Sequence, residues 1–227
     1  MCGALVESWR DGVACAPCWR ALAETTPDIC AKCGLPLPPM AAHYQTAERD
    51  CGSCREFSFT CARSGGAYTG ALRESVLWLK EHPQLSPQVC ALLSANFASL
   101  SAIQPVESII PVPLHPARQQ ARGFNQAEVI AQALSAISGL EVDTVSLVRE
   151  TATERHRAGM DTAMRAKSLK KAFTVRAPRL IAGLSVLVVD DVMTTGSTAH
   201  EIASTLRAGG ARTVSVLTLA RAISLFH

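Results

Sequence analysis

Residues 184–198 constrain the fold most strongly, because they combine a buried strand with an anion-binding turn. The nearly unbroken apolar run 184–189 is typical of a parallel strand covered on both faces. A turn of small residues follows and opens a helical stretch, 199–206, which the glycines at 209–210 close. Residues 213–220 supply the next apolar strand. The pattern predicts a βαβ unit with parallel strands, and therefore an α/β fold.

Two adjacent carboxylates, Asp190 and Asp191, stand at the carboxyl end of this strand. Like charges this close repel each other unless a ligand offsets them, and ribose hydroxyls or a hydrated Mg²⁺ are suitable partners. The turn 194–198 adds threonine and serine hydroxyls and a helix N-terminus, all of which favour a phosphate. The alternative is an ordinary βαβ turn with acidic residues at a strand end. The order of strand, acids, glycine and helix favours the phosphate site.

The segment resembles the phosphoribosyl pyrophosphate (PRPP) loop of type I phosphoribosyltransferases. In that family the two acids hold the ribose 2′- and 3′-hydroxyls, and the loop wraps the 5′-phosphate. The resemblance implies PRPP with Mg²⁺ as ligand, Asp190 and Asp191 as catalytic residues, and a mostly parallel sheet flanked by helices. The PRPP-binding residues that it implies are Asp190, Asp191, Val192, Met193, Thr194, Thr195, Gly196, Ser197 and Thr198. No sequence feature selects the acceptor of the phosphoribosyl group.

A second candidate site follows the predicted strand that begins at Ile109. Arg118 and Arg122 carry permanently charged, forked guanidinium groups that suit a pyrophosphate, and Gly123 lets the backbone approach closely. We expect both arginines to lie at the approach to the helix that ends at Gly139. Taken alone, they fit a solvated basic helix start equally well.

The same region carries a further resemblance. Pro111-Val112-Pro113, together with the Arg-Gly-Phe-Asn-Gln run at 122–126, is similar to the competence protein ComF family. The resemblance implies a type I phosphoribosyltransferase domain preceded by a double zinc ribbon. Members of the family are associated with the uptake or use of external DNA. Single-stranded DNA and a competence helicase or DNA-transport protein are therefore candidate partners by resemblance.

Residues 149–171 predict a mobile basic loop, with seven basic and three acidic side chains and few apolar ones. In type I phosphoribosyltransferases a flexible hood occupies this place and closes over PRPP. Glu154 and Ser168 stand where relatives tend to have Gln and Asn, which puts some polar contacts of the hood in doubt. The alternative is a solvated charged loop with no ligand role.

The N-terminal quarter contains seven of the nine cysteines, and six of these form Cys-x-x-Cys pairs. Two such pairs can hold one tetrahedral, structural Zn²⁺, and a site with four thiolates leaves no open position for catalysis. The clearer site combines the pair at 30 and 33 with the pair at 51 and 54. The metal ligands predicted for the two sites together are Cys2, Cys15, Cys18, Cys30, Cys33, Cys51 and Cys54.

The first of these sites lacks a ligand, because Cys15 and Cys18 have only Cys2 upstream. Met1-Cys2-Gly3 resembles the second half of a Cys-x-x-Cys-Gly motif, so we expect the natural start to lie a few codons upstream or the chain to have been trimmed. Disulfides are the alternative to zinc. No secretory signal is visible, which favours a reducing, cytoplasmic compartment.

We expect two domains, a zinc ribbon over residues 1–60 and a phosphoribosyltransferase-like domain over 61–227. A short cysteine-rich segment usually needs a metal to fold, whereas the longer block can bury its own core. The leading hypothesis is a PRPP-binding, phosphoribosyltransferase-like protein, with turnover left open. One alternative is a module that senses PRPP or a nucleotide without turnover and binds single-stranded DNA. Another is an interaction protein whose zinc ribbon recruits a partner. The net charge of +3 is too small to decide among them.

Overall fold

The computed structural model describes residues 12–24, 28–37, 51–150 and 172–223. Its centre is a four-stranded sheet in the order β1-β6-β5-β2, in which every neighbouring pair is parallel. A two-stranded antiparallel ribbon, β3–β4, stands apart from it. The elements are α1 Ala16–Glu24, β1 Cys61–Ser64, α2 Gly70–Leu79, α3 Pro87–Ile103, β2 Ser108–Pro111, α4 Pro116–Arg122, α5 Gln126–Ser138, β3 Leu147–Arg149, β4 Phe173–Val175, η3 Pro178–Leu180, β5 Ser185–Met193, α7 Ser197–Ala208 and β6 Thr213–Arg221.

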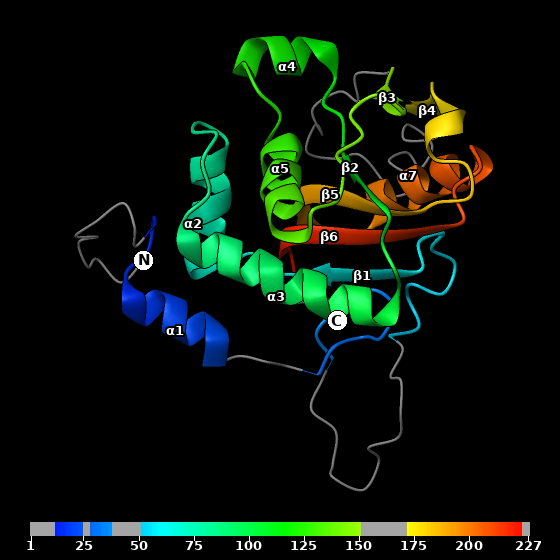
Figure 1. The fold of residues 1–227 in the computed structure, drawn as a ribbon. Coiled ribbons are helices and arrows are strands. Elements are labelled where there is room, and N and C mark those ends of the chain that lie inside the picture. The colour runs from blue at the N-terminus through cyan, green and yellow to red at the C-terminus, as the bar shows by residue number, and fades with distance from the viewer. Residues whose placement is uncertain (1–11, 25–27, 38–50, 151–171, 224–227) are drawn as a thin grey trace, which may run out of the picture.

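Helices cover both faces of the sheet (Figure 1). One face packs against α2, α3 and α5, with Leu72, Leu100 and Ile130 fully buried. The other face packs against α7, where Ile202 and Leu206 are fully buried. The predicted parallel α/β architecture is confirmed.

The predicted βαβ unit is present as β5, α7 and β6. β5 continues beyond the expected strand end, because Asp190, Val192 and Met193 still pair with β6. Since the sheet is parallel, the carboxyl ends of all four strands meet at one edge, and this edge carries the acid pair. Among the described residues, no helix is both long and apolar enough to cross a lipid bilayer.

Candidate phosphate site and four-cysteine centre

The two acidic residues at the end of β5 have different environments. Both are half-buried, and Asp190 Oδ1 accepts a hydrogen bond from the Asp191 backbone N–H at 2.9 Å. Asp190 lines a small pocket at the carboxyl edge of the sheet, whereas Asp191 is not part of the lining. This difference follows from the alternation of side chains along a strand.

Burial raises the pKa of Asp190 well above its usual range, and the neighbouring Asp191 charge raises it further. The backbone N–H of Asp191 and the positive charge of Arg149 act in the opposite direction. The ionised carboxylate of Asp190 is therefore poorly compensated by the chain itself. Ligand groups that donate hydrogen bonds to it, as sugar hydroxyls do, would stabilise its ionised form.

Residues 194–198, which we call the phosphate loop after their predicted ligand, lead from the end of β5 into the first turn of α7. Gly196 has φ +85°, in the left-handed region that favours glycine, and it stands at the N-cap of α7 without a side-chain cap. Thr195 Oγ1 lies 2.9 Å from Ser197 Oγ and accepts from the Ser197 N–H at 3.3 Å. The loop thus presents small hydroxyl side chains and the N-terminus of a 12-residue helix, an arrangement that attracts an oxyanion.

Neighbouring strands complete the pocket. Thr194, Gly196 and Thr198 line it together with Asp190, while Val112 follows β2 and Thr218 comes from β6. Thr218 pairs with Asp190 in the sheet register, so its place follows from strand pairing and not from any local motif. A second pocket lies near Trp78 and Val89, and none of its described lining residues is charged.

Arg118 and Arg122 lie on a helix of their own, α4, where the sequence predicted a loop. Pro116 occupies the first turn, His115 Nδ1 accepts from the Ala117 N–H at 3.3 Å, and Gly123 ends the helix with φ +83°. Both arginines are exposed. α4 connects β2 to α5 and projects beyond the rest of the fold (Figure 1).

Asn125, in the same motif, is almost fully buried. Its Oδ1 caps α5 by accepting from the Ala127 N–H at 3.0 Å, and its Nδ2 donates to the Val112 carbonyl at 3.0 Å. Val112 also lines the pocket. Asn125 therefore fixes the start of α5 against the segment that borders the pocket, a role that sequence reasoning missed although Asn is a favoured N-cap.

Arg149, at the end of β3, is the described member of the predicted basic hood that lies near the acid pair. Its guanidinium stands over the Phe173 ring at 5.3 Å from the centroid. Burial and the Arg118 charge lower the pKa of Arg149, while the Asp190 charge raises it. Arg118, Arg149 and Asp190 therefore share one electrostatic environment. Residues 151–171, with Glu154 and Ser168, lie outside the described residues.

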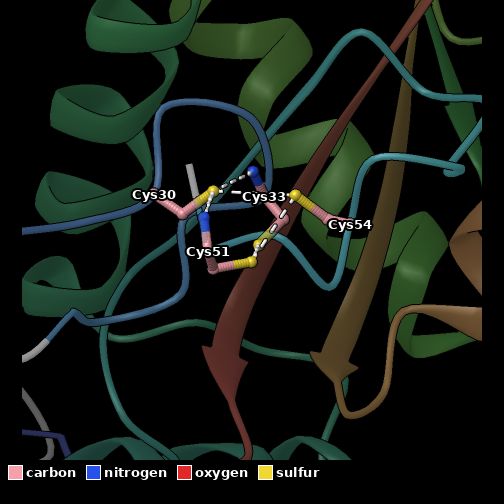
Figure 2. Close-up of side chains that lie close together, drawn as sticks. All are labelled: Cys30, Cys33, Cys51 and Cys54. Carbon is pink, nitrogen blue, oxygen red and sulfur yellow. Dashed lines mark hydrogen bonds between the residues drawn. The ribbon is translucent and has the colours of Figure 1, made fainter. Parts of the chain in front are cut away.

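Four of the predicted metal ligands converge. Figure 2 shows the sulfur atoms of Cys30, Cys33, Cys51 and Cys54 turned toward one another, all within 4.8 Å. The distances Cys30–Cys54, Cys33–Cys51 and Cys51–Cys54 between Sγ atoms are each 3.6 Å. Four thiolates around one Zn²⁺ at ~2.3 Å would be roughly 3.8 Å apart, so the spacing fits a tetrahedral zinc site.

The pKa values of these thiols are also consistent with a bound cation. Burial raises the pKa of Cys33 to about 11 and raises that of Cys54 still further. For Cys30, burial acts in the same direction but is outweighed by N–H donors from Cys33 and Cys51, which bring its pKa to about 7. A metal ion would offset the charge that burial disfavours.

The structure describes only part of the other predicted metal site. Cys15 Sγ and Cys18 Sγ lie 3.5 Å apart at the start of α1. Cys2 lies outside the described residues, so the first predicted site remains a prediction.

Comparisons with known proteins identify the family of this chain. Residues 117–225 match the model of the phosphoribosyl transferase domain. The chain is 34% identical over 218 residues to DNA utilization protein YhgH of Salmonella typhimurium, covering 92% of this chain and 90% of that protein. It is 42% identical over 120 residues to competence protein F of Haemophilus influenzae, about half of each chain (51%). It is 26% identical over 223 residues to competence protein ComFC of Bacillus subtilis, covering 93% and 85%.

Proposed function

Because this chain belongs to the ComF family of phosphoribosyltransferase-like competence and DNA utilization proteins, we propose that it binds PRPP at the carboxyl edge of its sheet. One observation carries the proposal. The acid pair lies near the end of β5, two residues before the phosphate loop that leads into α7, and Asp190 and the loop line the same pocket. A ribose 5-phosphate carries hydroxyls at one end, which suit the acids, and an oxyanion at the other end, which suits the loop.

Different residues bind the ribose, the 5′-phosphate and the pyrophosphate. Asp190 and Asp191 accept hydrogen bonds from the ribose hydroxyls, which favours their ionised forms. The phosphate loop and the N-terminus of α7 bind the 5′-phosphate. Arg118 and Arg122 bind the pyrophosphate by charge-assisted hydrogen bonds, helped by the positive charge of Arg149.

The arrangement is suited to substitution at C1 of the ribose. A bond forms between C1 and the acceptor as the bond from C1 to the pyrophosphate oxygen breaks, and the pyrophosphate leaves with the electron pair. The protein contributes position and charge stabilisation. Bound Mg²⁺ would neutralise part of the pyrophosphate charge, and Asp190 or Asp191 could hold it. The pocket itself does not select the acceptor.

Two further assignments belong to this proposal. The four-cysteine cluster of Cys30, Cys33, Cys51 and Cys54 holds a structural Zn²⁺, because four converging thiolates leave no open coordination position. The phosphoribosyl chemistry serves the handling of external DNA, which the names of the relatives support.

Titration calorimetry with PRPP, with and without Mg²⁺, tests the proposal. We expect Asp190→Asn/Asp191→Asn to weaken PRPP binding at least about tenfold, since hydrogen bonds to charged groups contribute ~1.5–3 kcal/mol each. Glu81→Gln is the control, because it removes one exposed carboxylate in the turn after α2. Pyrophosphate release in the same samples, where water is the acceptor, would show that the bond from C1 to the pyrophosphate can be broken. A folded wild-type chain that does not bind PRPP would overturn the proposal.

Titration of a single-stranded oligonucleotide at two salt concentrations tests direct DNA contact, which must weaken with salt.

A further inference from the structure

The Phe57 ring connects the four-cysteine cluster to the phosphate loop. The Phe57 N–H donates to the Cys54 carbonyl at 3.1 Å, so the residue is fixed directly to the last cysteine. Lys32, between the first two cysteines, donates to the Phe57 carbonyl at 2.8 Å. A Cβ atom at Gly196 would lie only 2.9 Å from the Phe57 ring. The ring therefore packs directly against the backbone of the loop, and this contact requires glycine there.

His200 forms a second contact just beyond the loop. Its Nδ1 accepts from the Ser58 backbone N–H at 3.0 Å, and its ring centroid lies 5.8 Å from that of Phe57. The His200 N–H in turn donates to the Gly196 carbonyl at 2.8 Å, in the first turn of α7. The chain that follows Cys54 thus packs against the same turn that the proposed 5′-phosphate would contact.

Arg221 connects the two regions by a separate route. It stands at the end of β6 with only 5% of its surface exposed, and its Nη1 donates to the Cys33 carbonyl at 2.6 Å. The same nitrogen lies 3.4 Å from Met193 Sδ. The Met193 methyl group is 2.9 Å from the position of a Cβ at Gly196. Two routes, one from Cys54 and one from Cys33, therefore converge on Gly196.

We infer that the four-cysteine cluster, through the positioning residues Phe57, His200 and Arg221, holds the phosphate loop in its binding conformation. Metal binding at the cluster and phosphate binding at the loop are then coupled, and by linkage each strengthens the other. The inference deepens the proposed function, because it names what regulates the same phosphate site. It concerns loop order, which is measurable without PRPP.

Phe57→Ala in the full-length, zinc-loaded chain tests the coupling, with hydrogen exchange of peptides covering residues 193–202 as the first measurement. We expect exchange there to be about tenfold faster than in the wild type, and PRPP affinity to fall by about the same factor. Phe57→Leu, which keeps apolar bulk against Gly196, should restore most of the protection. Phe97→Ala is the matched control, because Phe97 is also half-buried but packs on the opposite face of the sheet. It should leave exchange in 193–202 unchanged.

Metal content and PRPP binding separate the outcomes. Loss of zinc from the Phe57→Ala variant supports the coupling, since linkage acts in both directions. Unchanged exchange at 193–202 in that variant overturns the inference, even if PRPP binds. Faster exchange in a protein whose wild type does not bind PRPP supports the coupling and overturns the proposed function instead.

Discussion

At the scale of single residues, the acid pair shows what a motif conveys and what it leaves out. Asp190 and Asp191 and the loop after them are readable from the sequence, because strand, acids, glycine and helix follow one another in the chain. That Asp190 faces the pocket with Thr218 beside it is not readable, since it depends on the register of β5 against β6. The Phe57 and Arg221 contacts were missed for the same reason, because their partners are distant in the sequence.

The raised pKa of Asp190 predicts a stability cost at neutral pH. Its folded-state pKa lies above the ordinary value of ~3.9. The stability that this group contributes is therefore fully present below pH ~3.9 and is lost as pH rises through the folded-state pKa. Asp190→Asn removes the charge and should increase the free energy of unfolding by about 0.5–2 kcal/mol at pH 7.5, with little gain near pH 4. Urea unfolding of both proteins at the two pH values measures this. A variant that is less stable at pH 7.5 would contradict the prediction.

At the scale of elements, local signals were sufficient where they extended over a long apolar pattern. The segments predicted for β5, α7 and β6 are confirmed, with boundaries that shift by a few residues. α4 was predicted as a loop although its proline in the first turn and glycine after its end are helix boundary signals. It has no apolar face to bury, and burial is the main signal by which a short helix is found in a sequence.

The two exposed arginines of α4 should affect the affinity for PRPP but not the affinity for ribose 5-phosphate. If Arg118 and Arg122 bind the pyrophosphate, Arg118→Ala/Arg122→Ala should weaken PRPP binding more than tenfold, because each lost charge-assisted bond contributes ~1.5–3 kcal/mol. Ribose 5-phosphate lacks the pyrophosphate, so its affinity should stay within about twofold. Competition titrations with both ligands measure the difference.

Arg20→Ala/Arg179→Ala is the control for that measurement, because it removes the same charge from exposed sites on α1 and η3. Equal losses of affinity for PRPP and ribose 5-phosphate in the α4 variant would show that α4 acts on the protein as a whole and not on the pyrophosphate.

At the scale of the whole molecule, the cysteine cluster is part of the central core. The sequence predicted a ribbon over residues 1–60 beside an independent domain, and that boundary remains a prediction. Cys30, Cys33 and Cys54 are buried in the same hydrophobic cluster as Val188 and Ile202. Composition and Cys-x-x-Cys spacing predict a metal site, but they do not indicate which face of a sheet the cysteines cover.

Three hydrogen bonds fix the first pair of cysteines to the sheet. The Ala62 N–H donates to the Lys32 carbonyl at 2.7 Å, and the nearly buried Arg63 donates to the Ala31 carbonyl at 3.0 Å. Arg221 donates to the Cys33 carbonyl at 2.6 Å. The cysteine segment therefore covers this face of the sheet beside β1 and β6.

Zinc removal should consequently lower the stability of the whole chain in one transition. A metal that binds only the folded state at 1,000 times its dissociation constant contributes ~4 kcal/mol, which corresponds to a loss of roughly 10 °C in melting temperature for a chain of this size. Thermal unfolding followed by circular dichroism, before and after chelation under reducing conditions, measures the shift. Cys54→Ser should produce a similar loss, whereas Cys90→Ser, on α3 outside the cluster, should not. An unchanged main transition, with only a small separate one lost on chelation, would instead indicate an independently folded ribbon, because the helices and the sheet would then be stable without the metal.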